Sequence, residues 1–377
     1  MDNCIRNLSA GVSLIASDST WIEDKAIQQL QTTAQLPGMR RVVGMPDLHP
    51  GRGYPVGAAF FSSDTLYPAL VGNDIGCGMT LWQTDISSAR LNLDKLEKKI
   101  GNIDTALDEQ WQEELAQLAL STTGHEHSLG TIGGGNHFAE LQQIDAVHDS
   151  GAMDTLGLDR RSLLMLVHSG SRGLGEAILR RHVDQHGHSG IAFDSPAGVD
   201  YLQRHDEALR FAEANRRLIA ERILVNLRAQ GRSALDINHN LVSPGSVDSE
   251  AGWIHRKGAT PSDQGVAVIP GSRGDYSYLV QPIPLASSLY SLAHGAGRKW
   301  IRGDCKDRLA ARFSFDQLKR TSLGSRVICE DRALMYEEAP EAYKAIDSVV
   351  GSLRDAGLLR IIARLKPVLT YKRRGCC

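Results

Sequence analysis

The sequence has little of what marks several classes of protein. Its 377 residues include six cysteines, and 42 Lys and Arg residues against 44 Asp and Glu residues give a formal net charge of -2. A chain with this balance has no general positive field for nucleic acid, so a polyanion must be bound by a local cluster of cations. The cysteines show no paired framework, which favours thiol, metal-ligand or catalytic roles over disulfides.

Targeting and membrane signals are also missing. No run approaches the roughly 18 to 20 apolar residues of a membrane-spanning helix. Residues 1–6 lack the basic and apolar regions of a signal peptide, so we expect a cytoplasmic protein. The sequence contains no internal repeat and no low-complexity tract. It has no Walker pattern, which excludes an ordinary P-loop nucleotide site.

The apolar pattern predicts an α/β fold. Helices are expected over residues 21–36 and 201–230, with one or two more over 91–120. Strands are expected over 41–45, 56–61, 79–86, 163–168, 265–269 and 276–280. The ten residues 46–55 hold three prolines and two glycines, which predicts a rigid loop. Polar motifs are scattered from Asp74 to His294, so we expect one domain, residues 1–377, whose strand-end loops meet at a single site.

Asp74 and Cys77 form the first motif, in Asn-Asp-Ile-Gly-Cys-Gly. A carboxylate with a thiolate suits a borderline divalent cation such as Mn²⁺, Fe²⁺, Co²⁺ or Zn²⁺. The adjacent glycines permit backbone angles that aim both side chains at one point. The alternative is a buried structural cysteine beside a capping aspartate.

A glycine run forms the second motif, Gly133-Gly134-Gly135 followed by Asn136 and His137. Successive glycines let backbone N–H groups approach an anion closely, where an amide and an imidazole would meet it. A flexible turn before a helix is the alternative.

Three further histidines stand among small or amide residues. His168 ends an expected strand, where open α/β sheets place ligands. His239 lies between two asparagines that could orient it as hydrogen-bonding partners, and a structural role remains open for either histidine. His182, His186, His188 and His205 lie in polar surroundings and are expected to face solvent.

His294, in His-Gly-Ala-Gly-Arg, has an open approach to its ring, which suits a nucleophile. Arg298 and Arg302 are expected on one face of the following helix, where they can bind phosphates. A helix N-terminus with solvated arginines is the alternative. Asp47 and His49 are interpreted as residues that orient a metal ligand or an attacking hydroxyl. Together these residues, each set among glycine, serine or asparagine, predict metal chemistry.

At these motifs, and from about residue 20 to the end, the chain resembles the RtcB family of GTP-dependent RNA ligases. Matching segments occur in family order at 73–78, 133–138, 168–173, 239–240, 256–259, 269–272 and 294–298. The compact length and the loop at 47–55 look more like the branch coupled to release factor H than the tRNA-splicing branch. The resemblance implies an α/β domain of the RtcB type, with β-sheets surrounded by helices and a deep metal-containing cleft.

The resemblance also implies an activity: joining an RNA 3′-phosphate or 2′,3′-cyclic phosphate to a 5′-hydroxyl with GTP and two Mn²⁺ ions. His294 matches the histidine that attacks GTP. The matching metal ligands are Asp74, Cys77, His137, His168 and His239, with Cys77 bridging both ions. Nucleotide contacts match Asn136, Glu140, Ser272, Ser277, Tyr343 and Lys372, and RNA contacts match Arg172, Lys257 and Arg302.

The branch resemblance suggests RNA repair in the translation apparatus, with a release-factor-like protein or the ribosome as partner. Arg273 stands where splicing-type members usually have methionine, and residues 124–130 lack an arginine and a Pro-Gly-Gln stretch typical of that place. Both departures lie near the nucleotide and RNA surfaces and leave substrate choice open. Two other readings remain: a dimetal phosphodiesterase or phosphatase that does not join ends, and a non-catalytic ribosome-rescue accessory.

Overall fold

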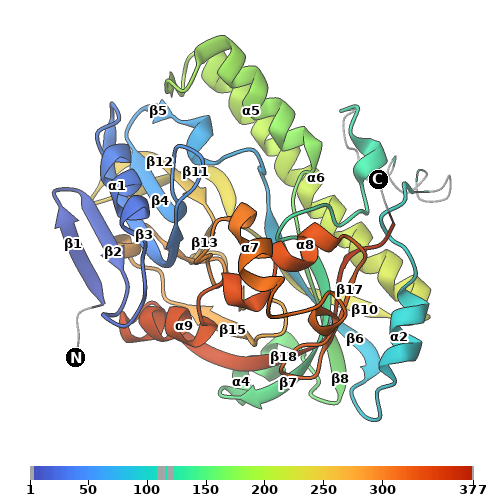
Figure 1. Ribbon diagram of the computed structural model, residues 1–377. Helices are drawn as coiled ribbons and strands as arrows, with labels where there is room; N and C mark the ends of the chain where they lie inside the picture. Colours follow the sequence, from blue (N-terminus) through green and yellow to red (C-terminus); the bar gives the residue numbers. More distant parts are fainter. Residues whose placement is uncertain (1–3, 108–111, 113–115, 117–122, 376–377) are drawn as a thin grey trace.

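The computed structural model describes residues 4–107, 112, 116 and 123–375. The fold is mixed α/β, as expected, with two large sheets and helices around them (Figure 1). None of the described helices is long and apolar enough to cross a membrane. Cys4, Cys77, Cys305 and Cys329 are buried.

The first sheet has six strands in the order β1-β2-β3-β4-β12-β11. Their bounds are Ile5–Ser9 (β1), Val12–Ile15 (β2), Met39–His49 (β3), Val56–Ser62 (β4), Glu250–Lys257 (β12) and Asn240–Val247 (β11). Strand β3 runs through Pro46 to His49, so the predicted loop 46–55 is wrong over its first four residues. The β3–β4 register shifts between Gly44 and His49. Pro46, which has no backbone N–H to donate, is tolerated in β3 because it lies at this irregularity.

The second sheet has the order β10-β6-β8-β7-β18-β15-β14, with β17 parallel to β18. Its strands are Gly231–Asn238 (β10), Gly78–Ser87 (β6), Ser162–Ser169 (β8), Phe138–Val147 (β7), Leu359–Arg373 (β18), Ser277–Pro282 (β15), Ala267–Pro270 (β14) and Arg326–Cys329 (β17). Residues 163–169 of β8 are all buried, which fits a central strand covered on both faces. Two short pairs complete the strands: Thr65–Leu66 (β5) with Ile191–Ala192 (β9), and Ala259–Pro261 (β13) with Ser291–Ala293 (β16).

Helices surround the two sheets (Figure 1). They are Asp24–Thr33 (α1), Leu93–Ile100 (α2), Ser150–Leu156 (α4), Gly173–His186 (α5), Pro196–Leu227 (α6), Arg302–Leu309 (α7), Arg332–Glu337 (α8) and Ile346–Asp355 (α9). The longest, α6, starts with Pro196 after Ser195, whose hydroxyl accepts from the Gly198 N–H. The predicted helices at 21–36 and 201–230 correspond to α1 and α6. Of the one or two helices predicted over 91–120, α2 is observed, and most of residues 101–120 lie outside the described residues.

Antiparallel pairing determines where the candidate ligands meet. Gly78 at the start of β6 pairs with Ser169 at the end of β8 and with Asn238 at the end of β10. Phe138 at the start of β7 pairs with His168. One end of each of these four strands therefore lies along the same edge of the second sheet.

Candidate functional site

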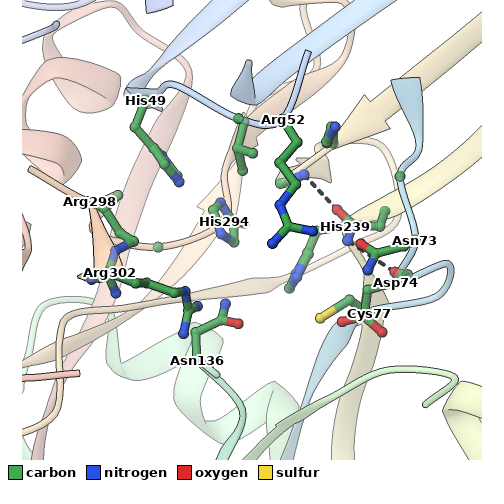
Figure 2. Close-up of a pocket in the computed structure, with 18 of the residues that line it drawn as sticks. His49, Arg52, Asn73, Asp74, Cys77, Asn136, His239, His294, Arg298 and Arg302 are labelled. Atoms are coloured by element: carbon green, nitrogen blue, oxygen red, sulfur yellow. Dashed lines mark hydrogen bonds between the residues drawn. The ribbon is translucent and has the colours of Figure 1, made fainter. Parts of the chain in front are cut away.

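A large open cavity, about 1540 Å³, lies at that edge and reaches the first sheet. Figure 2 shows His294 between two groups of side chains that face the same space: His239, Asp74 and Cys77 on one side, and Arg298 and Arg302 on the other. The sequence analysis predicted these residues, together with His137 and His168, from five separate motifs. The fold brings all of them to the lining of one cavity.

Asp74 and Cys77 lie in the tight loop before β6, where the Cys77 N–H donates to the Asp74 carbonyl oxygen at 3.1 Å. Gly76 within this loop has φ +75°, and a Cβ there would lie 2.7 Å from the Cβ of Ala212 on α6. Only glycine therefore fits both the left-handed conformation and the close approach of the helix. The loop holds the carboxylate and the sulfur on the same side.

His137 precedes β7 and contacts both of those groups. Its Nε2 lies 2.8 Å from Asp74 Oδ2 and 3.3 Å from Cys77 Sγ. Its Nδ1 lies 3.2 Å from the Ile132 carbonyl oxygen. Because a carbonyl oxygen only accepts, Nδ1 donates to it, and this turns Nε2 toward the carboxylate and the sulfur, where it could serve as a ligand to a cation.

His168, at the end of β8, and His239, between β10 and β11, complete the cluster. His168 Nε2 lies 3.2 Å from Cys77 Sγ and 3.3 Å from His239 Nε2. Burial lowers the pKa of both imidazoles well below the ordinary value. Neutral rings of this kind can donate lone pairs to a cation.

The five donors form two overlapping groups whose ligand atoms lie within 4.8 Å of one another. One group is Cys77, His168 and His239, and the other is Asp74, Cys77 and His137. Nδ1 of the buried His239 ring has no hydrogen-bond partner among the described residues. Sulfur, imidazole and carboxylate together fit a borderline divalent cation. Cys77 belongs to both groups, so the residues present could hold two cations that share the sulfur.

Burial and the nearby Asp74 charge raise the pKa of Cys77 well above its ordinary value, so the thiol is protonated in the metal-free protein. Burial opposes ionisation of Asp74 too, but His137 and Arg172 outweigh it and lower the pKa of that carboxyl. A cation would reverse the balance at the sulfur, since a coordinating thiol is deprotonated. Metal binding should therefore release a proton from Cys77.

The asparagines around His239 do not bond to its ring, so the prediction that they orient it directly is wrong. Asn240 accepts from the Gly258 N–H at 2.7 Å and donates to the Asp74 carbonyl oxygen at 3.0 Å. Asn238 accepts from Arg216 at 2.7 Å. Both amides fix the backbone on either side of the histidine, which places the ring indirectly.

His294 follows β16 and contacts one carboxylate. Its Nδ1 lies 2.6 Å from Asp47 Oδ2, and its side chain is 12% exposed while Asp47 is fully buried. Its ring centroid lies 4.8 Å from that of His239. A proton on Nδ1 that donates to Asp47 leaves the Nε2 lone pair free to act as a nucleophile.

The backbone on both sides of Asp47 is fixed by a lysine. Lys344 Nζ donates to the carbonyl oxygens of Pro46 at 2.9 Å and Leu48 at 2.7 Å. Nearby, His49 Nδ1 donates to the Asp47 carbonyl oxygen at 2.9 Å, and burial lowers the pKa of His49 to about 4. Figure 2 shows the His49 ring on the His294 side of the cavity. Lys344 had no motif signal in the sequence and was missed.

The residues expected to hold a nucleotide lie mostly along the wall of the cavity. Asn136, Glu140, Ser272, Tyr343 and Lys372 line it. Ser277 instead lies behind the wall: its hydroxyl accepts from Gln142, which also donates to Glu140 at 2.7 Å. Burial raises the pKa of Glu140 to about 7.

Glu338, just after α8, organises the cationic part of this wall and was also missed. Its carboxylate accepts from Arg298 at 3.2 Å, Arg302 at 2.8 Å and Tyr343 at 2.6 Å. Burial alone would raise its pKa, but Lys372, Arg302 and Arg298 lower it to about 2. A carboxylate that stays charged holds these groups at the cavity without neutralising all of them.

The expected RNA contacts Arg172, Lys257 and Arg302 all line the cavity. A Cβ at Gly133 would collide with the Arg172 guanidinium, and one at Gly135 would lie 3.2 Å from that of Arg302. The glycine run therefore lies between the two arginines. Burial lowers the pKa of Lys257 to about 8.

Two predictions near these residues are wrong. Arg298 precedes the helix, because α7 begins at Arg302, so the two arginines do not share a helical face; they meet through Glu338. His182 and His205 are buried, not solvated, because α5 and α6 pack together. His205 Nε2 accepts from the Val242 N–H of β11 at 3.1 Å, and His182 Nε2 lies 3.2 Å from the Ser189 carbonyl oxygen. His186 and His188 are exposed, as expected.

The family model described as "tRNA-splicing ligase RtcB" matches residues 29–123 and 111–373. A protein of Escherichia coli named "RNA-splicing ligase RtcB2" is 56% identical over 375 residues, which cover 100% of this chain and 99% of that protein. "tRNA-splicing ligase RtcB" of Nanoarchaeum equitans is 29% identical, with 93% of this chain and 92% of the relative covered. "RNA-splicing ligase RtcB" of Mycobacterium bovis is also 29% identical, with 90% and 99% covered.

The fold is mixed α/β, it holds a cluster of side chains that could bind a metal ion, and a ligase matches the chain over its full length. These findings define the class of the protein: it is an enzyme, and that enzyme is a ligase. The chain belongs to the RtcB family.

Proposed function

We propose that this enzyme joins RNA ends that carry a 3′-phosphate or 2′,3′-cyclic phosphate to ends that carry a 5′-hydroxyl, using GTP and two Mn²⁺ ions. Its relatives are named as RNA-splicing or tRNA-splicing ligases. The setting we propose is RNA repair in the cytoplasm, on broken RNA of the translation apparatus, with a release-factor-like protein or the ribosome as partner. We also propose that residues 1–377 form one domain.

The observation that carries this proposal is the placement of His294. Asp47 fixes Nδ1, the ring remains open to the cavity, and the metal-ligand cluster begins at the neighbouring ring of His239. A nucleophile next to sites for cations is what attack on a triphosphate requires.

A covalent route solves a chemical problem. An RNA 3′-phosphate is a poor electrophile, because it carries no group that a 5′-hydroxyl could expel. Attack of His294 Nε2 on the α-phosphorus of GTP forms a P–N bond and releases pyrophosphate. Transfer of GMP to an oxygen of the RNA 3′-phosphate restores the imidazole and creates a 3′-to-5′ pyrophosphate end. The 5′-hydroxyl then attacks the RNA phosphorus, and GMP leaves. A cyclic phosphate must first be opened by water to a 3′-phosphate.

In this proposal Asp74, Cys77, His137, His168 and His239 hold the cations. When bound, the ions would neutralise phosphate charge and activate the attacking oxygen. The Cys77 thiolate favours Mn²⁺ over Mg²⁺, because Mg²⁺ prefers oxygen ligands. Asn136, Glu140, Ser272, Tyr343 and Lys372 bind the nucleotide, with Ser277 supporting Glu140 through Gln142.

The phosphates of the two RNA ends need separate basic side chains. Arg172 and Arg302 contact opposite ends of the glycine run, and Lys257 adds a third cation from β12. Few phosphates are engaged at the site itself, so the cavity alone gives a modest salt dependence of RNA binding.

The test is covalent labelling. Purified protein incubated with α-labelled GTP and Mn²⁺, then denatured, should retain acid-labile label, and His294→Ala should abolish it. His186→Ala, an exposed histidine on α5, is the matched control and should label normally. A phosphodiesterase or phosphatase would leave the label free, and a non-catalytic accessory would also fail to seal a nicked stem-loop.

A further inference from the structure

One segment next to the cavity carries a clear excess of positive charge. Residues 298–332 contain ten Lys or Arg residues and five Asp or Glu residues, in a chain whose net charge is -2. The segment runs from the residues just before α7, through α7 and β17, to Arg332, the first residue of α8. Cations gathered in this way form the local cluster that a near-neutral protein needs to bind a polyanion.

Aromatic rings lie among these cations. Trp300, Phe313 and Phe315 are half-buried and all pack against the same small core beneath α7 and α8. Arg308 lies 5.1 Å from the Trp300 ring centroid, Arg312 lies 5.3 Å from that of Phe313, and Arg332 lies 5.1 Å from that of Phe315. We call these three arginines and three rings the basic–aromatic surface.

The arginine charges of this surface are largely available. Within the part of the chain that the structure describes, no ion pair involves Arg312 or Arg332. Arg308 has one, at 3.9 Å from Asp304, and both partners are about half exposed. Such a pair contributes little. Exposed guanidinium groups on aromatic rings give a surface that binds phosphates and stacks bases.

The surface is continuous with the cavity. Lys299, Trp300, Ile301 and Arg302 line the cavity, and Arg302 is also the first residue of α7. Ile301 is 66% exposed at this junction. The eight residues of α7 extend about 12 Å, and Figure 1 shows α8 beside α7. A strand that leaves the cavity past Arg302 therefore meets the basic–aromatic surface next.

We propose that this surface binds the single-stranded RNA that precedes the 3′-phosphate. This inference rests on the proposed function, in which the 3′-phosphate receives GMP from His294. Arg298 and Arg302 lie on one side of His294 (Figure 2), and we place the RNA strand that carries this phosphate on that side. The Arg172 end of the glycine run then remains for the 5′-hydroxyl strand. Planar guanidinium groups over rings favour RNA over an acidic protein, because nucleobases stack on both.

The test compares the double variant Arg312→Gln, Arg332→Gln with the control Arg161→Gln, Arg354→Gln, which makes the same charge change at exposed positions outside the cavity lining. Affinity is measured for a single-stranded RNA of about 12 nucleotides with a 3′-phosphate, for a dinucleotide 3′-phosphate, and for a 5′-hydroxyl strand of the same length. The Arg312→Gln, Arg332→Gln variant is expected to bind the long 3′-phosphate RNA about tenfold more weakly. The magnitude of the slope of log affinity against log salt should fall by about 1.4, because each lost phosphate contact to a single strand removes roughly 0.7.

The dinucleotide and the 5′-hydroxyl strand should bind the variant as they bind the wild type, and labelling by GTP should be unchanged. Arg312→Lys, Arg332→Lys should restore the salt slope. Binding of the long RNA equal to that of the control would overturn the proposal. So would a loss confined to the 5′-hydroxyl strand, or normal RNA binding with weakened binding of a protein partner. Failure of the wild type to label with GTP would instead contradict the proposed function.

Discussion

At the scale of single residues, the reactivity of His294 depends on Asp47. The carboxylate accepts from Nδ1 at 2.6 Å and, more weakly, from the His294 backbone N–H at 3.3 Å. Asp47→Asn keeps the shape but can present an N–H to the ring, which favours the tautomer with the proton on Nε2. We expect the rate of GTP labelling to fall about 10²- to 10⁴-fold.

That rate is measured in single-turnover labelling, with thermal unfolding as the check on folding. Asp248→Asn is the control, because Asp248 is exposed and pairs only with Arg41 among the described residues. Labelling of Asp47→Asn at the wild-type rate would show that the carboxylate does not set the tautomer.

Glu140 gives a pH-dependent prediction. Burial raises its pKa from an ordinary value near 4.5 to about 7. As the pH rises between these values, the unfolded chain loses its proton before the folded protein does, so the free energy of unfolding falls. Glu140→Gln removes this effect and should gain, relative to the wild type, roughly 3 kcal/mol between pH 4 and pH 8.

Urea unfolding of both proteins across that pH range measures the difference. Metal ligands titrate equally in both, so their contribution cancels. Two curves that run parallel from pH 4 to pH 8 would mean that Glu140 ionises normally in the folded protein.

At the scale of elements, one side chain of α6 ties together the strand ends that carry the ligands. Arg216 is fully buried and donates to the Gly76 carbonyl oxygen at 2.7 Å and to the Ser169 carbonyl oxygen at 3.1 Å. It also pairs with Asp236 and donates to Asn238. Helix α6 therefore fixes the positions of β6, β8 and β10 relative to one another.

Arg216→Met should lower the free energy of unfolding by about 3 to 5 kcal/mol, because it leaves Asp236 and two carbonyl groups without their partner. Arg217→Met, the neighbour that makes a surface pair with Glu221, should cost about 0.5 kcal/mol or less. Equal, small losses in denaturant titrations would show that Arg216 is not the tie between these strands.

Much of this arrangement could be predicted from the sequence, because its signals are local. Glycines at 72 and 76 and the strand end at His168 identify ligands that the antiparallel register then brings together. Periodicity located α1 and α6. What could not be predicted depends on packing between distant segments. Glu338 and Lys344 carry no motif, and their roles arise only when β3 and α7 reach them. His205 is buried because β11 lies against α6.

At the scale of the whole molecule, both sheets contribute to one site, so metal binding should stabilise the entire fold. Mn²⁺ at about 100 times its dissociation constant should raise the free energy of unfolding by about 2.7 kcal/mol. Cys77→Ser should lose most of this gain, because it removes the sulfur shared by both ligand groups.

Calorimetry with and without Mn²⁺ makes the measurement, and His186→Ala serves as the control. One cooperative transition, with equal calorimetric and van't Hoff enthalpies, is expected of a single domain. Two separate transitions, of which only one shifts with Mn²⁺, would contradict the single domain.

The central claim is that His294 carries the guanylyl group, and peptide mapping tests it most directly. Trypsin should release residues 274–298, a peptide in which His294 is the single histidine. After incubation with GTP and Mn²⁺ and digestion at alkaline pH, mass spectrometry should find one GMP on this peptide, attached at position 294. GMP on a different peptide, or RNA sealing without GMP on any peptide, would contradict the account.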